Sequence, residues 1–165
     1  MDTMNATVEP APLGIDFHAD PMGPGRPMRV LVADDEEPMR DLMTRVLARG
    51  GCDVVAVGDG AEAVEAESDG SQPFDVVILD MAMPRKNGVQ AYREIAQHNS
   101  ASRFLFTSAY YEGRLLNEVL REGRSGFLPK PFLPGCILEE VQNLVRGEDG
   151  QGAPEPSTAL PIVFE

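Results

Sequence analysis

The sequence predicts one α/β domain, a doubly wound five-stranded parallel sheet of strand order 2-1-3-4-5 with helices on both faces. Short, nearly continuous apolar runs recur along the chain, which is typical of strands buried on both faces. Stretches with apolar residues three and four positions apart separate these runs, and this spacing indicates amphipathic helices. Acidic residues end two of the apolar runs, where a parallel sheet places its binding edge.

The first strand is expected over residues 28–33, and a helix follows from about Pro38, since proline suits a first helical turn. The pair Gly50-Gly51 ends this helix. Its buried face is formed by Met39, Leu42, Met43, Val46 and Leu47.

The second strand is expected over 53–57, with a short helix near 61–67. The third strand, over 74–79, is the most apolar and leads to a helix near 88–98.

The fourth strand is expected over 103–107, followed by a helix near 110–122 and a fifth strand over 126–128. The last helix has an apolar face of Ile137, Leu138, Val141, Leu144 and Val145.

The flanks of this domain differ from it in composition. Residues 1–27 are rich in proline and glycine and are expected to form a flexible leader. Residues 147–165 are expected to form a flexible acidic tail, which leaves 28–146 as the folded domain. The sequence after 146 is too short for a DNA-binding or catalytic output domain, so any effector is expected to be a separate protein.

The charge and residue usage exclude several functions. A net charge of -13 disfavours binding to nucleic acids and anionic membranes, and no apolar run is long enough for a membrane span. No secretory signal precedes the domain, so a cytoplasmic protein is expected. Cys52 and Cys136 are expected to be reduced, and the isolated His18 and His98 do not suggest zinc binding.

Charged residues follow three of the predicted strands: Asp35 the first, Asp80 the third and Lys130 the fifth. The carboxyl ends of parallel strands lie on one edge, so these side chains are expected to meet. Two carboxylates held together repel each other unless a cation joins them, and carboxylate oxygens favour Mg²⁺. A lysine beside that cation suits a phosphate.

Some residues near these strand ends also have a purely structural explanation. Asp34 and Asp35 alone could stabilise the start of the following helix. Thr107 could be an ordinary β-branched strand residue. Asp80 is harder to explain in this way, because a carboxylate at the end of a buried strand loses hydration unless something pairs with it.

Taken together, the motifs resemble the receiver domain of bacterial two-component response regulators, of the single-domain, chemotaxis-regulator-like kind with a flavodoxin-like fold. The resemblance covers roughly residues 28–146. It rests on Val32-Ala33-Asp34-Asp35-Glu36, Val77-Ile78-Leu79-Asp80-Met81-Ala82-Met83-Pro84 with Asn87-Gly88, Phe106-Thr107-Ser108-Ala109, and Phe127-Leu128-Pro129-Lys130-Pro131-Phe132.

The resemblance implies that Asp80 is the phosphoacceptor, taking a phosphoryl group from a phosphohistidine of a sensor histidine kinase or phosphotransfer protein. It implies Mg²⁺ as cofactor, bound by Asp35 and Asp80, with Asp34 acting through water and the main-chain carbonyl of Ala82 completing the set. Such a protein would be a phosphorelay component, catalysing only its own phosphorylation and dephosphorylation.

For the other motif residues, the resemblance implies that Lys130 pairs with the phosphoryl oxygens and that its bond to Pro131 is cis. Thr107 would bond the phosphoryl group, and Phe127 would be the aromatic residue that moves when the domain switches. Ala82 and Ala109 carry no polar side chain to position a water, so rapid self-hydrolysis is not expected. A monomer or weak dimer is expected.

Other functions fit these residues less well. A phosphorylation-independent adaptor would not need the acidic cluster. An Asp-dependent phosphatase of the haloacid dehalogenase type needs a second Asp where Ala82 stands, and in a flavodoxin-like redox protein the acids from Asp34 onward would repel a phosphate. The segment 58–63 matches G-x-G-x-x-A, but its acids would crowd a pyrophosphate, and a tight turn explains it better.

Overall fold

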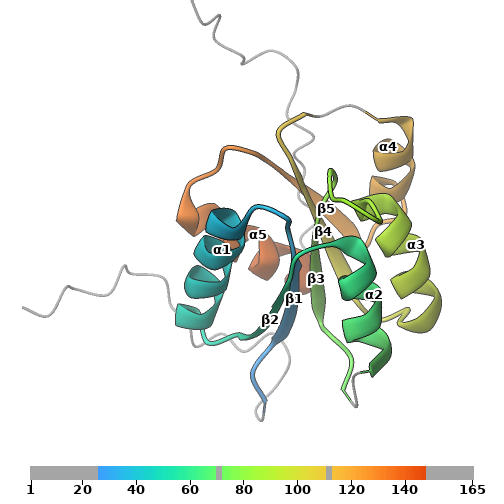
Figure 1. Cartoon of the computed structure of the whole chain (residues 1–165). Helices are drawn as coiled ribbons and strands as arrows, with labels where there is room; N and C mark the ends of the chain where they lie inside the picture. The colour runs from blue at the N-terminus through green and yellow to red at the C-terminus, as the bar shows by residue number, and fades with distance from the viewer. Residues whose placement is uncertain (1–25, 70–71, 111–112, 148–165) are drawn as a thin grey trace, which may run out of the picture.

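The sheet has the predicted topology. The computed structural model describes residues 26–69, 72–110 and 113–147. Within them, one parallel sheet has the order β2-β1-β3-β4-β5 (Figure 1). The strands are β1 (Arg29–Ala33), β2 (Asp53–Val57), β3 (Val76–Asp80), β4 (Arg103–Ser108) and β5 (Ser125–Pro129).

Helices cover both faces of the sheet, which confirms the α/β fold class. The helices are α1 (Glu37–Arg49), α2 (Gly60–Asp69), α3 (Gly88–His98), α4 (Arg114–Leu120) and α5 (Pro134–Arg146). Helices α1 and α5 lie on one face, and α2, α3 and α4 lie on the other (Figure 1). Because both faces are covered, each residue of the central strand β3 is buried.

Local sequence explains the ends of α1. Pro38 lies in its first turn, where a missing N–H leaves no bond unmade. After the helix, Gly51 has a φ of +84°, a left-handed backbone that glycine adopts without strain. This turn leads directly into β2.

The boundaries of α4 differ from the expected 110–122. The helix starts at Arg114, and Tyr110 precedes it, with its N–H donated to the Ser108 hydroxyl. Gly113 occupies an extended, non-helical position immediately before the first turn, while residues 111 and 112 lie outside the described part. At the other end, Gly123 has a φ of +74°, which stops helical continuation.

The expected leader and tail fall almost wholly on residues outside the described part, so their flexibility stays a prediction. Arg26, which the sequence assigns to the leader, contacts the domain through two hydrogen bonds to the Asp75 carboxylate, of 2.7 and 2.8 Å. Cys52 and Cys136 are free thiols packed against the core. None of the described helices has the length and apolar character of a membrane span.

Candidate functional site

Three carboxylates meet at the carboxyl edge of the sheet. The register of β1 and β3 pairs Ala33 with Leu79, so Asp34 and Asp80 end neighbouring strands side by side. Asp34 is fully buried, Asp80 is 4% exposed and Asp35 is exposed. One oxygen of each of the three carboxylates lies within 4.8 Å of the others, which is close enough for all three to face one cation.

Lys130 is the cation of this cluster. Its ammonium donates to the Asp34 carboxylate at 2.7 Å and lies 3.6 Å from Asp80 and 3.5 Å from Glu36. Burial alone would lower the pKa of Lys130, but the bond to Asp34 and the surrounding carboxylates outweigh it and raise the pKa. Lys130 therefore stays charged, and its bond to Pro131 is cis, as the resemblance implied.

Asp80 is buried with only partial compensation for its charge. Burial is the main cause that raises its pKa to about 6, and the charges of Asp34 and Asp35 add to it. Lys130 and the N–H of Ala82 act in the opposite direction without cancelling the effect. A cation bound among the three carboxylates would favour the ionised form of Asp80.

Thr107 lies next to Asp80 at the end of the neighbouring strand. The register of β3 and β4 pairs the two residues. Thr107 is fully buried, and its hydroxyl has no hydrogen-bond partner among the described residues. A buried hydroxyl without a partner costs free energy, so its presence suggests a ligand that completes it.

Ala82 and Phe127 are two further residues to which the resemblance assigned a role. Ala82 is exposed in the loop after β3, and its N–H bonds Asp80; the role expected for its carbonyl stays a prediction. Phe127 lies in β5, half-buried against the core that includes Phe106, its register partner in β4. The Phe127 ring is therefore part of the core surface between β4 and β5 and is not fully covered.

The residues at this edge fit Mg²⁺. Carboxylate oxygens are ligands that Mg²⁺ prefers, and the ion would relieve the repulsion among the three acids. Within the described residues, no other group of three His, Cys, Asp or Glu side chains comes close enough to share an ion. We assign Asp34, Asp35 and Asp80 as the residues that would hold it.

The sequence did not predict two contacts near the cluster. Glu36, at the start of α1, makes no side-chain cap bond and reaches Lys130 instead. Asp59, at the start of α2, pairs with Arg85 in the loop after β3. Both contacts join segments far apart in the sequence, so no local pattern signals them.

The G-x-G-x-x-A segment serves packing rather than nucleotide binding. Asp59 accepts the N–H groups of Ala61 and Glu62 and so starts α2. A Cβ at Gly60 would lie 2.3 Å from the carbonyl oxygen of Lys86, which explains why glycine stands there. The structure thus agrees with a tight turn between strand and helix.

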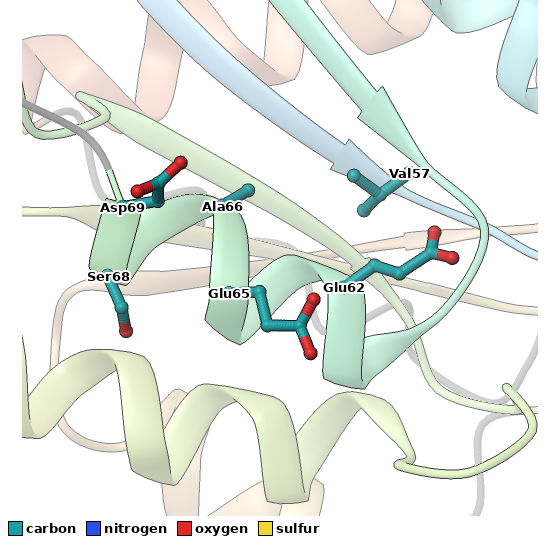
Figure 2. A pocket seen from close by; sticks show the side chains of 6 residues that line it. All are labelled: Val57, Glu62, Glu65, Ala66, Ser68 and Asp69. Carbon is teal, nitrogen blue, oxygen red and sulfur yellow. The ribbon is translucent and has the colours of Figure 1, made fainter.

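A hollow beside α2 holds none of the predicted site residues (Figure 2). Its wall carries three acids, and Figure 2 shows Glu62 directed toward Val57 at the end of β2. Glu62 is already bonded to the N–H of Gly58 and to Arg85. The lining residues are Val57, Glu62, Glu65, Ala66, Ser68 and Asp69.

Comparison with known families assigns the chain. A model described as the response regulator receiver domain matches residues 30–142. The chain belongs to the response regulator receiver family. The matched segment contains every residue of the cluster, from Asp34 to Lys130.

The chain covers different shares of its curated relatives. It is 32% identical over 114 residues to the chemotaxis protein CheY of Bacillus subtilis, covering 68% of this chain and 93% of that protein. It is 37% identical over 117 residues to the transcriptional regulatory protein PdtaR of Mycobacterium tuberculosis, covering 70% of this chain but only 56% of PdtaR.

Solved structures support a CheY-like receiver fold. CheY4 of Vibrio cholerae matches with a TM-score of 0.64 and 26% identity, over 72% of this chain and 98% of that one. The CheX–CheY–BeF3–Mg²⁺ complex of Borrelia burgdorferi matches with a TM-score of 0.66 and 26% identity, over 73% and 90%.

Proposed function

We propose that the domain is a phosphorylation-dependent signalling receiver, in which Asp80 accepts a phosphoryl group in the presence of Mg²⁺. The observation that carries the proposal is the cluster itself: three carboxylates within 4.8 Å of one another, with a charged lysine 3.6 Å from Asp80. The donor would be a phosphohistidine of a sensor histidine kinase or phosphotransfer protein, and the setting a cytoplasmic phosphorelay. The receiver would catalyse no reaction but its own phosphorylation and dephosphorylation.

In phosphoryl transfer from a phosphohistidine, Asp80 would act as the nucleophile. An ionised Asp80 oxygen attacks the phosphorus, the P–N bond to the histidine breaks, and an acyl phosphate forms while the imidazole leaves with the electron pair. Bound Mg²⁺ would supply charge neutralisation on the phosphoryl oxygens. Lys130, already held at this edge by Asp34, would move its ammonium toward the same oxygens.

Thr107 and Phe127 would transmit the change. The unpartnered Thr107 hydroxyl can donate to a phosphoryl oxygen on its neighbour Asp80. The movement of Thr107 would open space behind it, and Phe127 would turn inward to fill that space. Phenylalanine has no hydroxyl to keep hydrated, which favours burial of the ring. The remodelled surface would be α4, β5 and α5, where a separate effector would bind.

The solved complex of a related CheY with BeF3 and Mg²⁺ supports the choice of ion and of phosphoryl chemistry. The decisive experiment is intact-mass measurement after incubation with acetyl phosphate and Mg²⁺. We expect one added phosphoryl group on the native chain and none on D80N. A D75N variant, which changes the acid at the other end of the same run, is the control and should still be phosphorylated.

Modification of D80N to the native level would contradict the assignment of the acceptor. A native chain that takes up no phosphate but binds partners would instead support the adaptor alternative. The switch has its own test in beryllofluoride-induced backbone NMR shifts. We expect α4 and β5 to respond in the native protein and to respond weakly in T107A.

A further inference from the structure

Two loops at the carboxyl edge are clamped together beside the carboxylate cluster. Asp59, in the loop between β2 and α2, is 6% exposed. One of its oxygens accepts the N–H groups of Ala61 and Glu62 at 2.8 and 2.9 Å. Its other oxygen accepts from the Arg85 side chain at 2.6 Å, and Arg85 belongs to the loop between β3 and α3. We call the Asp59–Arg85 ion pair the latch.

The backbone at Arg85 indicates that the latch holds the loop in shape. Its φ is +61°, a left-handed conformation that is unfavourable for a side chain of this kind. Glu62 adds a second anchor, since one of its oxygens lies 3.3 Å from Arg85 and the other accepts the N–H of Gly58. Side-chain bonds from Asp59 and from Glu62 at the start of α2 therefore offset the backbone cost at Arg85.

Two close backbone contacts hold the same loop at its end. A Cβ at Gly60 would lie 2.3 Å from the Lys86 carbonyl oxygen, so α2 starts directly against the loop. A Cβ at Gly88 would lie 2.6 Å from the Asp80 carbonyl oxygen, so α3 starts directly against the end of β3. The end of this loop is thus closely packed against the start of α2, and the start of α3 against the end of β3.

We propose that Asp59 and Arg85 are positioning residues for the metal: their latch fixes the loop whose Ala82 carbonyl is the expected main-chain ligand of Mg²⁺. The start of this loop is tied to the phosphoacceptor as well, because the Ala82 N–H bonds the Asp80 carboxylate. The inference rests on the proposed function, since it concerns the same ion.

Electrostatics alone predicts the opposite effect of removing Arg85. Taking a positive charge away from a cation site should tighten Mg²⁺ binding. If the latch positions the loop, removing Arg85 should weaken binding instead. The two explanations therefore differ in the sign of the change in affinity.

The chain offers a matched control for this test. Lys86 is the next residue of the loop, and its side chain pairs with Glu94 of α3 at 2.5 Å rather than with the loop before α2. K86A removes the same charge from the same loop and keeps the latch. R85G removes the latch and accepts the left-handed backbone without strain.

The experiment is calorimetric titration of the full chain with MgCl₂. We expect R85G to raise the Kd for Mg²⁺ about tenfold, as loss of an orienting group around a metal site does. K86A should leave the Kd unchanged or lower it. D59N keeps an oxygen that can cap α2, and it should raise the Kd for Mg²⁺ as R85G does. The double variant D59N/R85G should have a Kd no higher than that of the single variant with the higher Kd, because both changes break the same contact.

An R85G protein that binds Mg²⁺ as tightly as the native chain, or a double variant whose loss is the sum of the two single losses, would overturn the latch. Failure of the native chain to bind Mg²⁺ at all would overturn the proposed function itself. The two failures are therefore distinguishable in one set of titrations.

Discussion

The two ends of the third apolar run carry acids with opposite surroundings. Asp75, just before β3, and Asp80, its last residue, have side chains that are 8% and 6% exposed. Asp75 accepts two bonds from Arg26 at 2.7 and 2.8 Å and the N–H of Arg29 at 2.8 Å. Asp80 faces two further carboxylates, and its nearest ammonium is 3.6 Å away.

Buried hydroxyls at the two ends of β4 repeat the contrast. Ser102, before the strand, donates to the Phe74 carbonyl at 2.6 Å and accepts from the Asn99 amide at 2.6 Å. The Thr107 hydroxyl, near the other end, has no hydrogen-bond partner among the described residues. Ser102 is therefore satisfied by protein groups before β4, whereas the Thr107 hydroxyl, next to the carboxylate cluster, is left for a ligand to satisfy.

The largest expected effect is on the pH dependence of stability. Because the folded protein raises the pKa of Asp80 from 3.8 to about 6, it binds this proton more tightly than the unfolded chain. The contribution is fully present below pH 3.8 and is lost as the pH rises through about 6. We expect this loss to reach at most about 3 kcal/mol in metal-free protein.

Urea unfolding in EDTA over this pH range, for native protein and D80N, measures the effect. The difference in unfolding free energy between the two should grow in favour of D80N as the pH rises. A difference that stays constant across the range would contradict the account of Asp80.

The next largest effect is a difference in stability between variants of Asp75 and Asp80 at neutral pH. D75N should lower the free energy of unfolding by about 2 kcal/mol, because it weakens charge-assisted bonds to Arg26 and Arg29. D80N should leave stability equal or higher, since it removes an undercompensated charge. Thermal melting of both variants without Mg²⁺ provides the comparison, and an equal loss in both would remove the distinction.

The two hydroxyls give a smaller difference. S102A should cost about 1 kcal/mol, because it leaves the Asn99 amide and the Phe74 carbonyl with one partner fewer. T107V keeps the shape and removes only an unpaired hydroxyl, so stability should stay equal or rise. Urea titrations at pH 7 would decide, and a loss in T107V larger than that in S102A would reverse the argument.

The smallest effect is expected at Glu36. Its side chain is 65% exposed and 3.5 Å from Lys130, which remains bonded to Asp34 when Glu36 is changed. E36Q should therefore alter stability by less than about 0.5 kcal/mol. A loss well above that value in chemical unfolding would show that Glu36 is a required part of the cluster.

The sequence alone determined the alternation of strands and helices and the meeting of Asp35, Asp80 and Lys130 at one edge of the sheet. These follow from short-range patterns and from one topological rule, that parallel strands end together. The start of α4 was placed too early, since the apolar spacing does not show that the backbone at Gly113 is extended.

Only the tertiary structure decided which contacts hold the loops at the carboxyl edge of the sheet and how the pKa of Asp80 is shifted there. The latch joins Asp59 and Arg85, which lie 26 residues apart in the sequence and belong to two different loops. The raised pKa of Asp80 depends on burial and on neighbours from other strands. Likewise, the Thr107 hydroxyl lacks a hydrogen-bond partner among the described residues only because of the groups that surround it in the folded domain. Burial and side-chain direction arise from packing between distant segments, which the order of residues does not express.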